Sequence, residues 1–126
     1  MHRSRLAGFI IDCDSADLDE AANFWAAALG YPKKSPADVS ESPYVELVTS
    51  DDELVVEVQQ VGHESRVHID IESDDIEAEA VRLEALGATR VGKIRTWMVM
   101  EAPTGQRFCI VRAGSKRFAE IANEWQ

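Results

Sequence analysis

The sequence predicts an α+β fold in which two successive β-α-β-β-β modules form one cupped, mixed sheet, followed by a C-terminal helix. Three observations lead to this prediction: a helix pattern that occurs twice, strand patterns on both sides of each copy, and a long stretch between the copies. The 126 residues are enough for one ordinary core, and 45% of them are apolar, which is typical of a globular protein. We therefore expect a single domain over residues 1–126.

The helix pattern has the same beginning and end in both copies. The first helix is predicted to begin after Asp17, an N-cap acid with Glu20 three positions later, and to end before Gly30. The second copy runs from Asp74 to Gly87, 57 residues farther along, which is near half of the chain. Apolar residues recur at helical spacing inside both copies, and several identities match in register. These matches indicate duplication of a half-length unit.

Runs of residues with strand character flank both predicted helices. These runs are 8–13, a short segment at Tyr31, 44–48, 54–61, 66–72, 88–94, 97–101 and 107–111. The 43 residues from Tyr31 to Ser73 leave room for four strands, whereas a ferredoxin-like fold needs only two strands between its helices. The spacing therefore favours the β-α-β-β-β repeat.

These patterns also predict the boundaries within the domain. Module one covers about residues 7–62 and module two about residues 65–113. A loop with Ser and Pro is expected over 35–42. Apolar residues at helical spacing predict the terminal helix over about 115–124, which either docks on the sheet or forms a subunit contact.

Charge and cysteine content exclude several classes of partner. Thirteen Lys and Arg residues against 23 Asp and Glu residues give a net charge of −10. Nucleic acids and anionic membrane surfaces attract clustered positive charge, so we expect neither as a partner. No run approaches the ~20 apolar residues that span a bilayer. Cys13 and Cys109 are expected to be reduced thiols of a cytoplasmic protein, with a disulfide between them as the less favoured alternative.

Three stretches, 17–30, 65–87 and 102–109, together resemble the glyoxalase-like branch of the vicinal oxygen chelate superfamily, and the likeness extends over about residues 7–112. The superfamily includes glyoxalase I, extradiol dioxygenases, methylmalonyl-CoA epimerase, fosfomycin-modifying enzymes and bleomycin-binding proteins. The resemblance implies a cleft in which the first and last strands of each module lend one side chain each to a divalent ion. This fold carries many chemistries, so the reaction has to be argued from the site.

Four positions correspond to the ion ligands that the resemblance implies. His68 matches the histidine of module two, and Cys109 stands where a carboxylate is usual. On the last strand of module one the match is Glu57 or Gln59, while the position near Ile10 offers no ligand. A zinc or nickel ion held by His68, Glu57 and Cys109 is one outcome, because catalytic zinc sites use three protein ligands. A protein without a metal is the favoured outcome, because this set suits magnesium or manganese poorly.

His68 and Glu57 are the candidate catalytic residues. An imidazole gains or loses a proton near neutral pH, so His68 would act as a base or as a metal ligand. The alternative is a half-buried histidine paired with Asp70 or Glu72. Glu57 and Gln59 share one face of their strand and would line the cleft, or else lie on an exposed strand face.

The predicted substrate-binding residues are Gln59, Arg107, Cys109, Tyr44 and Trp97. Arg107 would hold a carboxylate or phosphate, or else pair with acids at the surface. Tyr44 and Trp97, beside Met98 and Met100, would offer apolar and stacking surface to a ligand, or else pack in the core. The two other histidines, one near the N-terminus and one in a loop, receive no role.

The leading functional prediction is a small-molecule site in the cleft of the sheet, whose activity in an enzyme would be that of a lyase or isomerase on a small oxygenated substrate. If the protein is an enzyme, the resemblance implies proton abstraction, isomerisation or addition. The alternative is a metal-free protein that binds or sequesters a drug, similar to the bleomycin-resistance type, and a third reading is an interaction domain whose cup is filled by its own side chains. In each case we expect a homodimer, and in the first two the partner is a small molecule.

Overall fold

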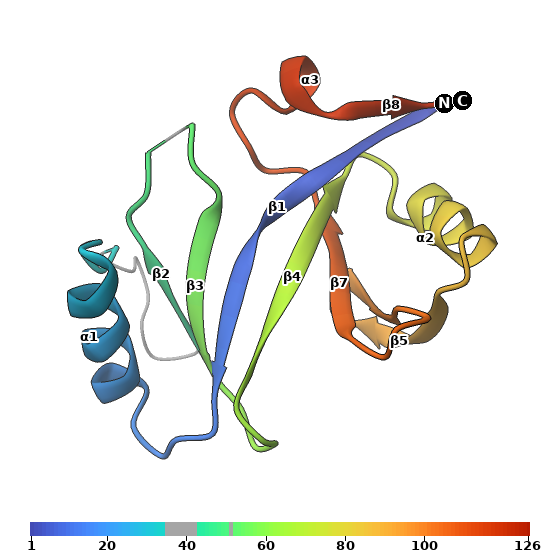
Figure 1. Ribbon diagram of the computed structural model, residues 1–126. Coiled ribbons are helices and arrows are strands. Elements are labelled where there is room, and N and C mark those ends of the chain that lie inside the picture. Colours follow the sequence, from blue (N-terminus) through green and yellow to red (C-terminus); the bar gives the residue numbers. More distant parts are fainter. Residues whose placement is uncertain (35–42, 51) are drawn as a thin grey trace. The chain divides into compact units, whose positions relative to one another are not determined.

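The computed structural model describes residues 1–34, 43–50 and 52–126, and its described part has the predicted mixed α+β architecture, with eight strands and three helices (Figure 1). The predicted loop over 35–42 lies outside the described residues. The chain divides into two compact units. The α1 unit is Gly8–Val67, and the α2 unit combines Met1–Ala7 with His68–Gln126. The first strand, β1 (His2–Cys13), contributes to both units.

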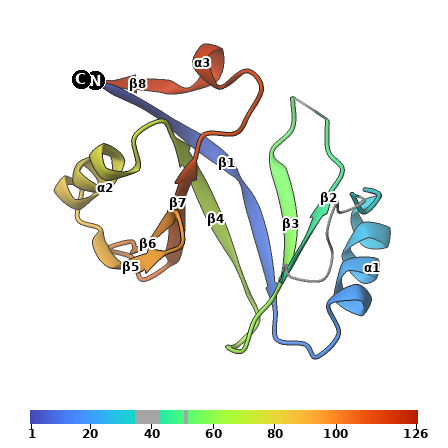
Figure 2. The same cartoon turned by 180° about the vertical axis from the view of Figure 1, so that it is seen from behind.

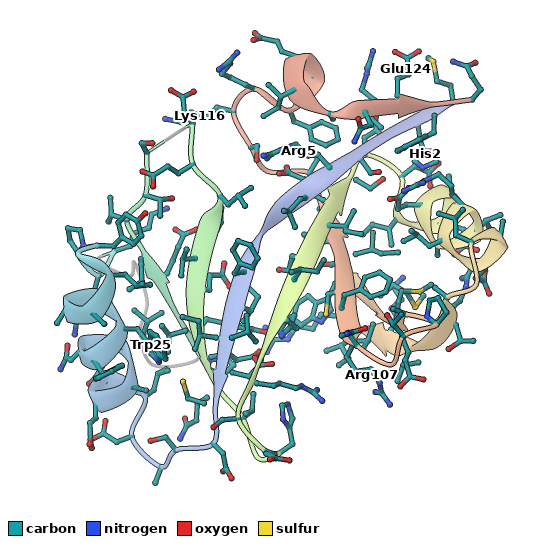
Figure 3. All side chains as sticks on the ribbon, viewed as in Figure 1. His2, Arg5, Trp25, Arg107, Lys116 and Glu124 are labelled. Atoms are coloured by element: carbon teal, nitrogen blue, oxygen red, sulfur yellow. The ribbon has the colours of Figure 1, made fainter. Side chains whose placement is uncertain are left out.

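In the α1 unit, a three-stranded sheet carries one helix. The strands lie in the order β2-β3-β1, where β2 is Tyr44–Leu47 and β3 is Val55–Gln60, and β3 runs parallel to β1 and antiparallel to β2. Helix α1 (Leu18–Leu29) packs on one face of this sheet. The buried core between them consists of Ala22, Val45, Leu47 and Val58. Trp25 lies between α1 and the strands and packs against this core (Figure 3).

Both ends of α1 form as the sequence predicts. The carboxylate of Asp17 accepts a hydrogen bond from the backbone N–H of Glu20 at 3.1 Å, which satisfies one of the unpaired donors of the first turn. Gly30 ends the helix with a φ of 75°, a left-handed conformation that glycine adopts without steric strain.

The segment after α1 differs from the prediction. The short strand expected at Tyr31 is only a single β-bridge between Lys33 and Leu47. The carbonyl of Pro32 accepts a hydrogen bond from the N–H of Val48, but proline has no N–H to donate, so a continuous ladder cannot run through it. Within the described residues, module one therefore has a bridge in place of its second strand.

The α2 unit follows the predicted β-α-β-β-β order. Its elements are β4 (Arg66–Ser73, of which the first two residues belong to the α1 unit), α2 (Ile76–Ala85), β5 (Thr89–Ile94), β6 (Trp97–Glu101) and β7 (Arg107–Arg112). The strands lie in the order β4-β7-β6-β5, with β7 parallel to β4 and the other neighbours antiparallel. Helix α2 covers one face of this sheet (Figure 2). The core between helix and sheet consists of Ala80, Leu83, Ala88, Met100, Phe108 and Ile110.

The second helix begins one residue later than predicted. Its N-cap is Asp75, whose carboxylate accepts a hydrogen bond from the N–H of Ala78 at 3.0 Å. Asp74 instead pairs with Arg3 of β1, because its N–H donates to the Arg3 carbonyl and its carboxylate accepts from the Arg3 N–H at 2.7 Å. Gly87 takes the expected left-handed conformation, with a φ of 110°. The 57-residue repeat therefore holds at the closing glycines and shifts by one residue at the caps.

The prediction of a terminal helix over 115–124 is wrong in its extent. Helix α3 (Phe118–Ile121) is a single turn, and β8 (Asn123–Trp125) follows it and pairs antiparallel with the start of β1. The indole N–H of Trp125 donates to Ser4 Oγ at 2.9 Å, and the Arg82 guanidinium lies 3.9 Å from the centre of its ring. These contacts hold the tail in an extended conformation. Strand β1 accordingly begins six residues earlier than predicted.

Both cysteines are free thiols, as predicted, with Cys13 in the α1 unit and Cys109 in the α2 unit. Among the described residues, no helix has both the length and the apolar character that crossing a membrane requires.

Candidate functional site

The sheet of the α2 unit has one face opposite to its helix, here called its helix-free face. Ile71 packs against the core beneath α2, so the two-residue period of a strand places the polar residues of β4 on the other side. The register extends this face across β7 and β6. Its residues are His68, Asp70, Glu72, Trp97, Val99, Glu101, Arg107, Cys109 and Val111. Four of the predicted site residues therefore share one surface.

His68, Asp70 and Cys109 form a cluster on this face. Asp70 is the register partner of Cys109 in the parallel pair β4–β7, and His68 lies two residues before Asp70 on the same strand. An imidazole nitrogen, a carboxylate oxygen and the Sγ atom all lie within 4.8 Å of one another. The side chains of His68 and Asp70 are only 12% and 18% exposed. Three chemically different donors are thus held together in a largely buried place.

The contact between His68 and Asp70 is too long for a strong hydrogen bond. Nε2 of His68 lies 3.5 Å from Oδ1 of Asp70, whereas a charge-assisted N–H···O bond closes to about 2.8 Å. This Oδ1 atom is buried and has no hydrogen-bond partner among the described residues. Burying a carboxylate oxygen without a donor is unfavourable, so such atoms commonly contact a bound ion or water. Asp70 therefore has the capacity to bind a ligand at this point.

Glu72, the next acid on β4, is engaged elsewhere. Its carboxylate accepts hydrogen bonds from the N–H groups of Gly114 and Ser115 at 3.0 Å each, from Arg5 at 2.8 Å, and from the Ser115 hydroxyl. Burial alone would raise the pKa of Glu72, but the hydrogen bonds from Ser115 and Gly114 and the charge of Arg5 outweigh burial and lower it. Glu72 thus anchors the tail after β7. Of the two acids predicted as alternative partners of His68, the structure pairs Asp70 with it.

Arg107 and Trp97 lie on the same face as the cluster. Arg107 Nε donates to Oε1 of Glu101, its register partner on β6, at 3.1 Å, and both side chains are exposed (Figure 3). Such an exposed pair is weak, so an anionic ligand can compete for the guanidinium. Trp97 is partly buried at the start of β6. Met98 and Met100 point the other way, into the core beneath α2, and do not offer ligand surface.

The α1 unit has a helix-free face of its own. The valines of β3 that flank Glu57 pack against the core beneath α1, so Glu57 and Gln59 point to the opposite side. The register places Gln59 between Tyr44 of β2 and Asp12 of β1. Three predicted site residues therefore share this face: Glu57, Gln59 and Tyr44.

Asp12 is a buried acid on this face that the sequence analysis did not select. It is 3% exposed, and its Oδ2 atom lies 3.8 Å from Arg66 Nε. Asp12 comes two residues after Ile10, the ligand position suggested by the resemblance, and it shares the face of Ile10 by the two-residue period. That period is the signal by which the sequence could have revealed it.

The likeness to known proteins agrees with this architecture. The family model described as a glyoxalase-like domain matches residues 9–111. The chain belongs to the glyoxalase-like domain family. No curated protein matches it in sequence.

Several solved structures share the fold of this glyoxalase-like domain. Methylmalonyl-CoA epimerase from Mycobacterium tuberculosis has a TM-score of 0.62 at 17% identity, covering 90% of this chain and 91% of that chain. A methylmalonyl-CoA epimerase in complex with methylmalonyl-CoA and NH4+ has a TM-score of 0.56 at 18% identity, covering 88% and 96%. A member of the glyoxalase/bleomycin resistance protein/dioxygenase superfamily from Vibrio splendidus has a TM-score of 0.51 at 20% identity, covering 85% and 98%. At these identities the likeness establishes the fold.

In this glyoxalase-like domain, the predicted metal ligands are divided between the two units. His68 and Cys109 lie together in the α2 unit, with Asp70 as a third donor that the prediction did not include. Glu57 lies in the α1 unit. One imidazole, one carboxylate and one thiol fit an ion of the zinc class, and the buried Oδ1 atom of Asp70 supports this fit. Magnesium and manganese, which prefer oxygen ligands, fit poorly.

Proposed function

We propose that this glyoxalase-like domain is a lyase or isomerase for a small oxygenated substrate, and that the substrate binds on the helix-free face of the α2 unit. The observation that carries the proposal is the convergence of His68, Asp70 and Cys109 on that face. Isomerisation or elimination next to a carbonyl group places negative charge on the carbonyl oxygen in the transition state. Preorganised donors at that oxygen accelerate such reactions.

The residues of the cluster would act on the substrate oxygen. Without a bound ion, an N–H of the His68 ring would donate to the oxygen as charge develops there. With an ion held by His68, Asp70 and Cys109, the ion would instead supply Lewis-acid polarisation of this oxygen in place of the imidazole N–H. Arg107 would bind a substrate carboxylate in place of Glu101. Trp97 would contact the apolar part of the substrate, as the sequence predicted.

The similar structures support an isomerase among these reaction classes. Two of them are methylmalonyl-CoA epimerases, and one of the two holds methylmalonyl-CoA. An epimerase is an isomerase, so the same fold supports this kind of reaction in those proteins. Small CoA thioesters are therefore one class of compound to test with this chain.

The drug-binding alternative has less support. It predicted an apolar pocket lined by Trp97, Tyr44 and two methionines. Met100 is fully buried in the core of the α2 unit, and Met98 packs against that core. The described contacts therefore favour the polar cluster over an apolar pocket as the ligand-binding feature.

Exchange of a substrate proton with solvent tests the proposal. Small carbonyl compounds with an acidic C–H group, including 2-oxoaldehydes, their hemithioacetals and acyl-CoA thioesters, are incubated with the protein in D2O and followed by proton NMR. We expect exchange in at least one compound. The variant His68→Ala lacks the imidazole that polarises the substrate oxygen, so it should exchange the proton about 10²- to 10⁴-fold more slowly.

His63→Ala is the matched control for this experiment. His63 is an exposed histidine whose ring bonds the Glu64 carbonyl, so its removal should leave the exchange rate unchanged. Exchange no faster than in buffer for every compound, or equal rates in the wild type and in His68→Ala, would overturn the proposal. Tight binding of an aromatic compound without any exchange would instead support the drug-binding alternative.

A further inference from the structure

We infer that His68, Asp70 and Cys109, which all belong to the α2 unit, are ligands of one metal ion, and that the Cys109 thiolate makes the site prefer zinc-class ions to magnesium and manganese. The inference uses the same cluster as the proposed function, and it specifies the cofactor of that cluster. It replaces the ligand set expected from the sequence, because Asp70 takes the place that was assigned to Glu57.

The distances among the three donors suit ligands of one ion. In tetrahedral zinc sites the metal lies about 2.0–2.2 Å from nitrogen and oxygen and about 2.3 Å from sulfur, so neighbouring ligand atoms are roughly 3.3–3.6 Å apart. The separation of 3.5 Å between His68 Nε2 and Asp70 Oδ1 falls in this range, and an imidazole nitrogen, a carboxylate oxygen and the Cys109 Sγ atom all lie within 4.8 Å of one another. A direct hydrogen bond between the first two would be about 0.7 Å shorter.

The burial of Asp70 supports the same conclusion independently of these distances. Its Oδ1 atom is buried without a hydrogen-bond donor among the described residues, although the adjacent imidazole is near enough to approach it. A cation coordinated at this atom would compensate the lost hydration. The partial exposure of His68 and Asp70 leaves the cluster accessible from solvent, which a catalytic site with an open coordination position requires.

The backbone holds the three donors in place without help from any loop. Asp70 and Cys109 are register partners on adjacent parallel strands, and His68 projects from the same strand and the same face as Asp70. On the other face of the sheet, Ile71 and Ile110 pack against the core beneath α2, which fixes the rotation of both strands. An ion therefore finds donors already placed on rigid elements, so little conformational entropy is lost on binding.

The donor chemistry determines which ions the site prefers. A thiolate and an imidazole are ligands for zinc, cobalt and nickel, whereas magnesium and manganese prefer oxygen, of which the cluster offers one carboxylate. Cys109 must lose its proton to bind, so loading releases a proton and weakens at acidic pH. Cys109 is thus the residue whose replacement should alter ion preference most.

Cobalt titration of the full-length protein tests this site. After dialysis against a chelator, Co2+ is added, and the thiolate-to-cobalt charge-transfer band in the near ultraviolet is recorded. We expect saturation at one equivalent, displacement of cobalt by zinc, and no displacement by a tenfold excess of magnesium or manganese. Asp70→Asn should weaken cobalt binding at least about tenfold.

Two cysteine variants make the test specific. Cys109→Ser should abolish the charge-transfer band, whereas Cys13→Ser, the matched control at the other half-buried thiol, should retain it. Cys109→Asp should bind cobalt without the band and should bind manganese more tightly than the wild type does. A wild type without the band, a band that survives in Cys109→Ser, or unchanged binding in Asp70→Asn would overturn the inference.

The cobalt and proton-exchange experiments separate this inference from the proposed function. Cobalt binding with the expected spectrum but no proton exchange would refute the proposed function and support the metal site. Proton exchange by a chelator-treated protein that gives no cobalt band would support the proposed function and refute the metal site. Zinc should also raise the melting temperature of the wild type by linkage, and it should not raise that of Cys109→Ser to the same extent.

Discussion

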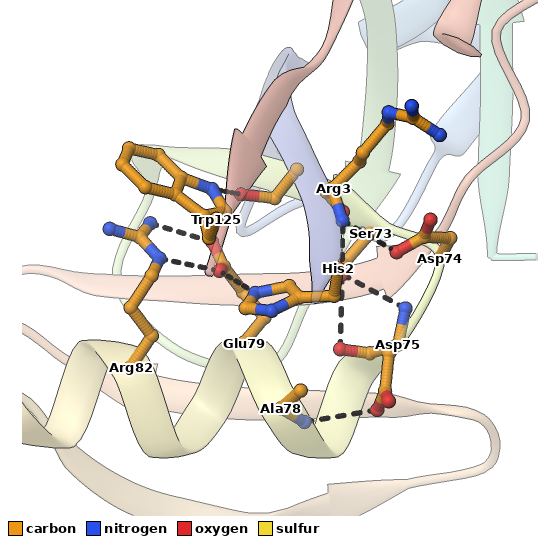
Figure 4. Close-up of polar contacts among 10 residues, drawn as sticks. His2, Arg3, Ser73, Asp74, Asp75, Ala78, Glu79, Arg82 and Trp125 are labelled. Carbon is orange, nitrogen blue, oxygen red and sulfur yellow. Dashed lines mark hydrogen bonds and ion pairs between the residues drawn. The ribbon is translucent and has the colours of Figure 1, made fainter.

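One of the buried carboxylates, Glu79, connects helix α2 to both ends of the chain. Its Oε1 atom lies 2.8 Å from His2 Nε2 and accepts from Arg82 Nε at 2.7 Å, while Oε2 accepts from a second Arg82 nitrogen at 2.9 Å (Figure 4). Arg82 also lies over the ring of Trp125. His2, which received no role from the sequence, therefore has a structural one. The charged group is tolerated in the core because each of its oxygens has a partner.

Glu79 should make stability depend on acidity. Burial alone would raise its pKa, but the hydrogen bonds from Arg82, Ser4 and His2 and the charge of Arg82 lower it from 4.5 to about 2. A depressed pKa in the folded state means that the ionised group stabilises the fold fully above about pH 5 and that this stabilisation is lost as pH falls toward 2. We expect Glu79→Gln to remove on the order of 3 kcal/mol of unfolding free energy at pH 7 and less at pH 3.

Urea denaturation at pH 7, 5 and 3 measures this dependence. Glu120→Gln is the control, because Glu120 forms only an exposed pair with Arg117 in the described structure, and such pairs contribute little. If wild type and Glu79→Gln differ by the same unfolding free energy at all three pH values, the assignment of acid sensitivity to Glu79 is wrong.

At the scale of secondary-structure elements, the close pairing of β1 and β3 aligns the residues on the helix-free face of the α1 unit. Gly8 is the register partner of Val55, and a Cβ atom at position 8 would lie 2.1 Å from the Val55 carbonyl oxygen. The absence of a side chain therefore lets the two strands pair. The same pairing brings Asp12 beside Gln59 farther along the strands. Gly8, to which the sequence analysis assigned no role, thus permits the strand pairing that aligns Asp12 with Gln59.

Gly8→Ala should separate these strands and destabilise the protein by about 3 kcal/mol, at the upper end of what overpacking costs. Chemical denaturation of the wild type and the variant measures the difference. Gly62→Ala is the matched control, since its Cβ would meet nothing within 4 Å and its φ is not in the left-handed region. The control should stay within about 0.5 kcal/mol of the wild type. Equal stability of both alanine variants would contradict the argument.

At the scale of the whole molecule, the predicted catalytic residues are distributed over both units. His68 lies in the α2 unit and Glu57 in the α1 unit, each on the helix-free face of its own sheet. The catalytic role of Glu57 stays a prediction from the sequence, as do the homodimer, the cytoplasmic location and the absence of nucleic-acid binding. The net charge of −10 remains the physical basis of the last of these.

Glu57→Gln separates catalysis from metal binding. If Glu57 is the general base, the variant should slow substrate proton exchange about 10²-fold while leaving the cobalt charge-transfer band of the α2 unit unchanged. Proton NMR and absorption spectra of one protein sample give both readings. Glu46→Gln, at the register partner of Glu57 on β2, is the matched control and should affect neither. An unchanged exchange rate in Glu57→Gln would exclude it as the base.

Local signals in the sequence were sufficient to predict the ends of the first helix, the order of elements in module two and the face of β4 that carries His68. The cap at Asp17, the turn glycines at positions 30 and 87, and the β-α-β-β-β order of module two all follow from interactions between residues close in the chain. The alternation along β4 likewise placed His68 on a polar face. These features depend on backbone conformation and on periods of 2 and 3.6 residues, which a single segment reveals.

Contacts between distant segments decided the rest. Asp70 and Glu72 have equivalent positions in the alternation of β4, and only tertiary contacts distinguish them: Glu72 binds the tail at Ser115, while Asp70 meets Cys109. The tail residue Trp125 fits a helical pattern, yet its bonds to β1 and α2 make the chain end as a strand. Strand register and tail docking join residues that are tens of positions apart, and hydrophobic periodicity within one segment carries no information about such pairings.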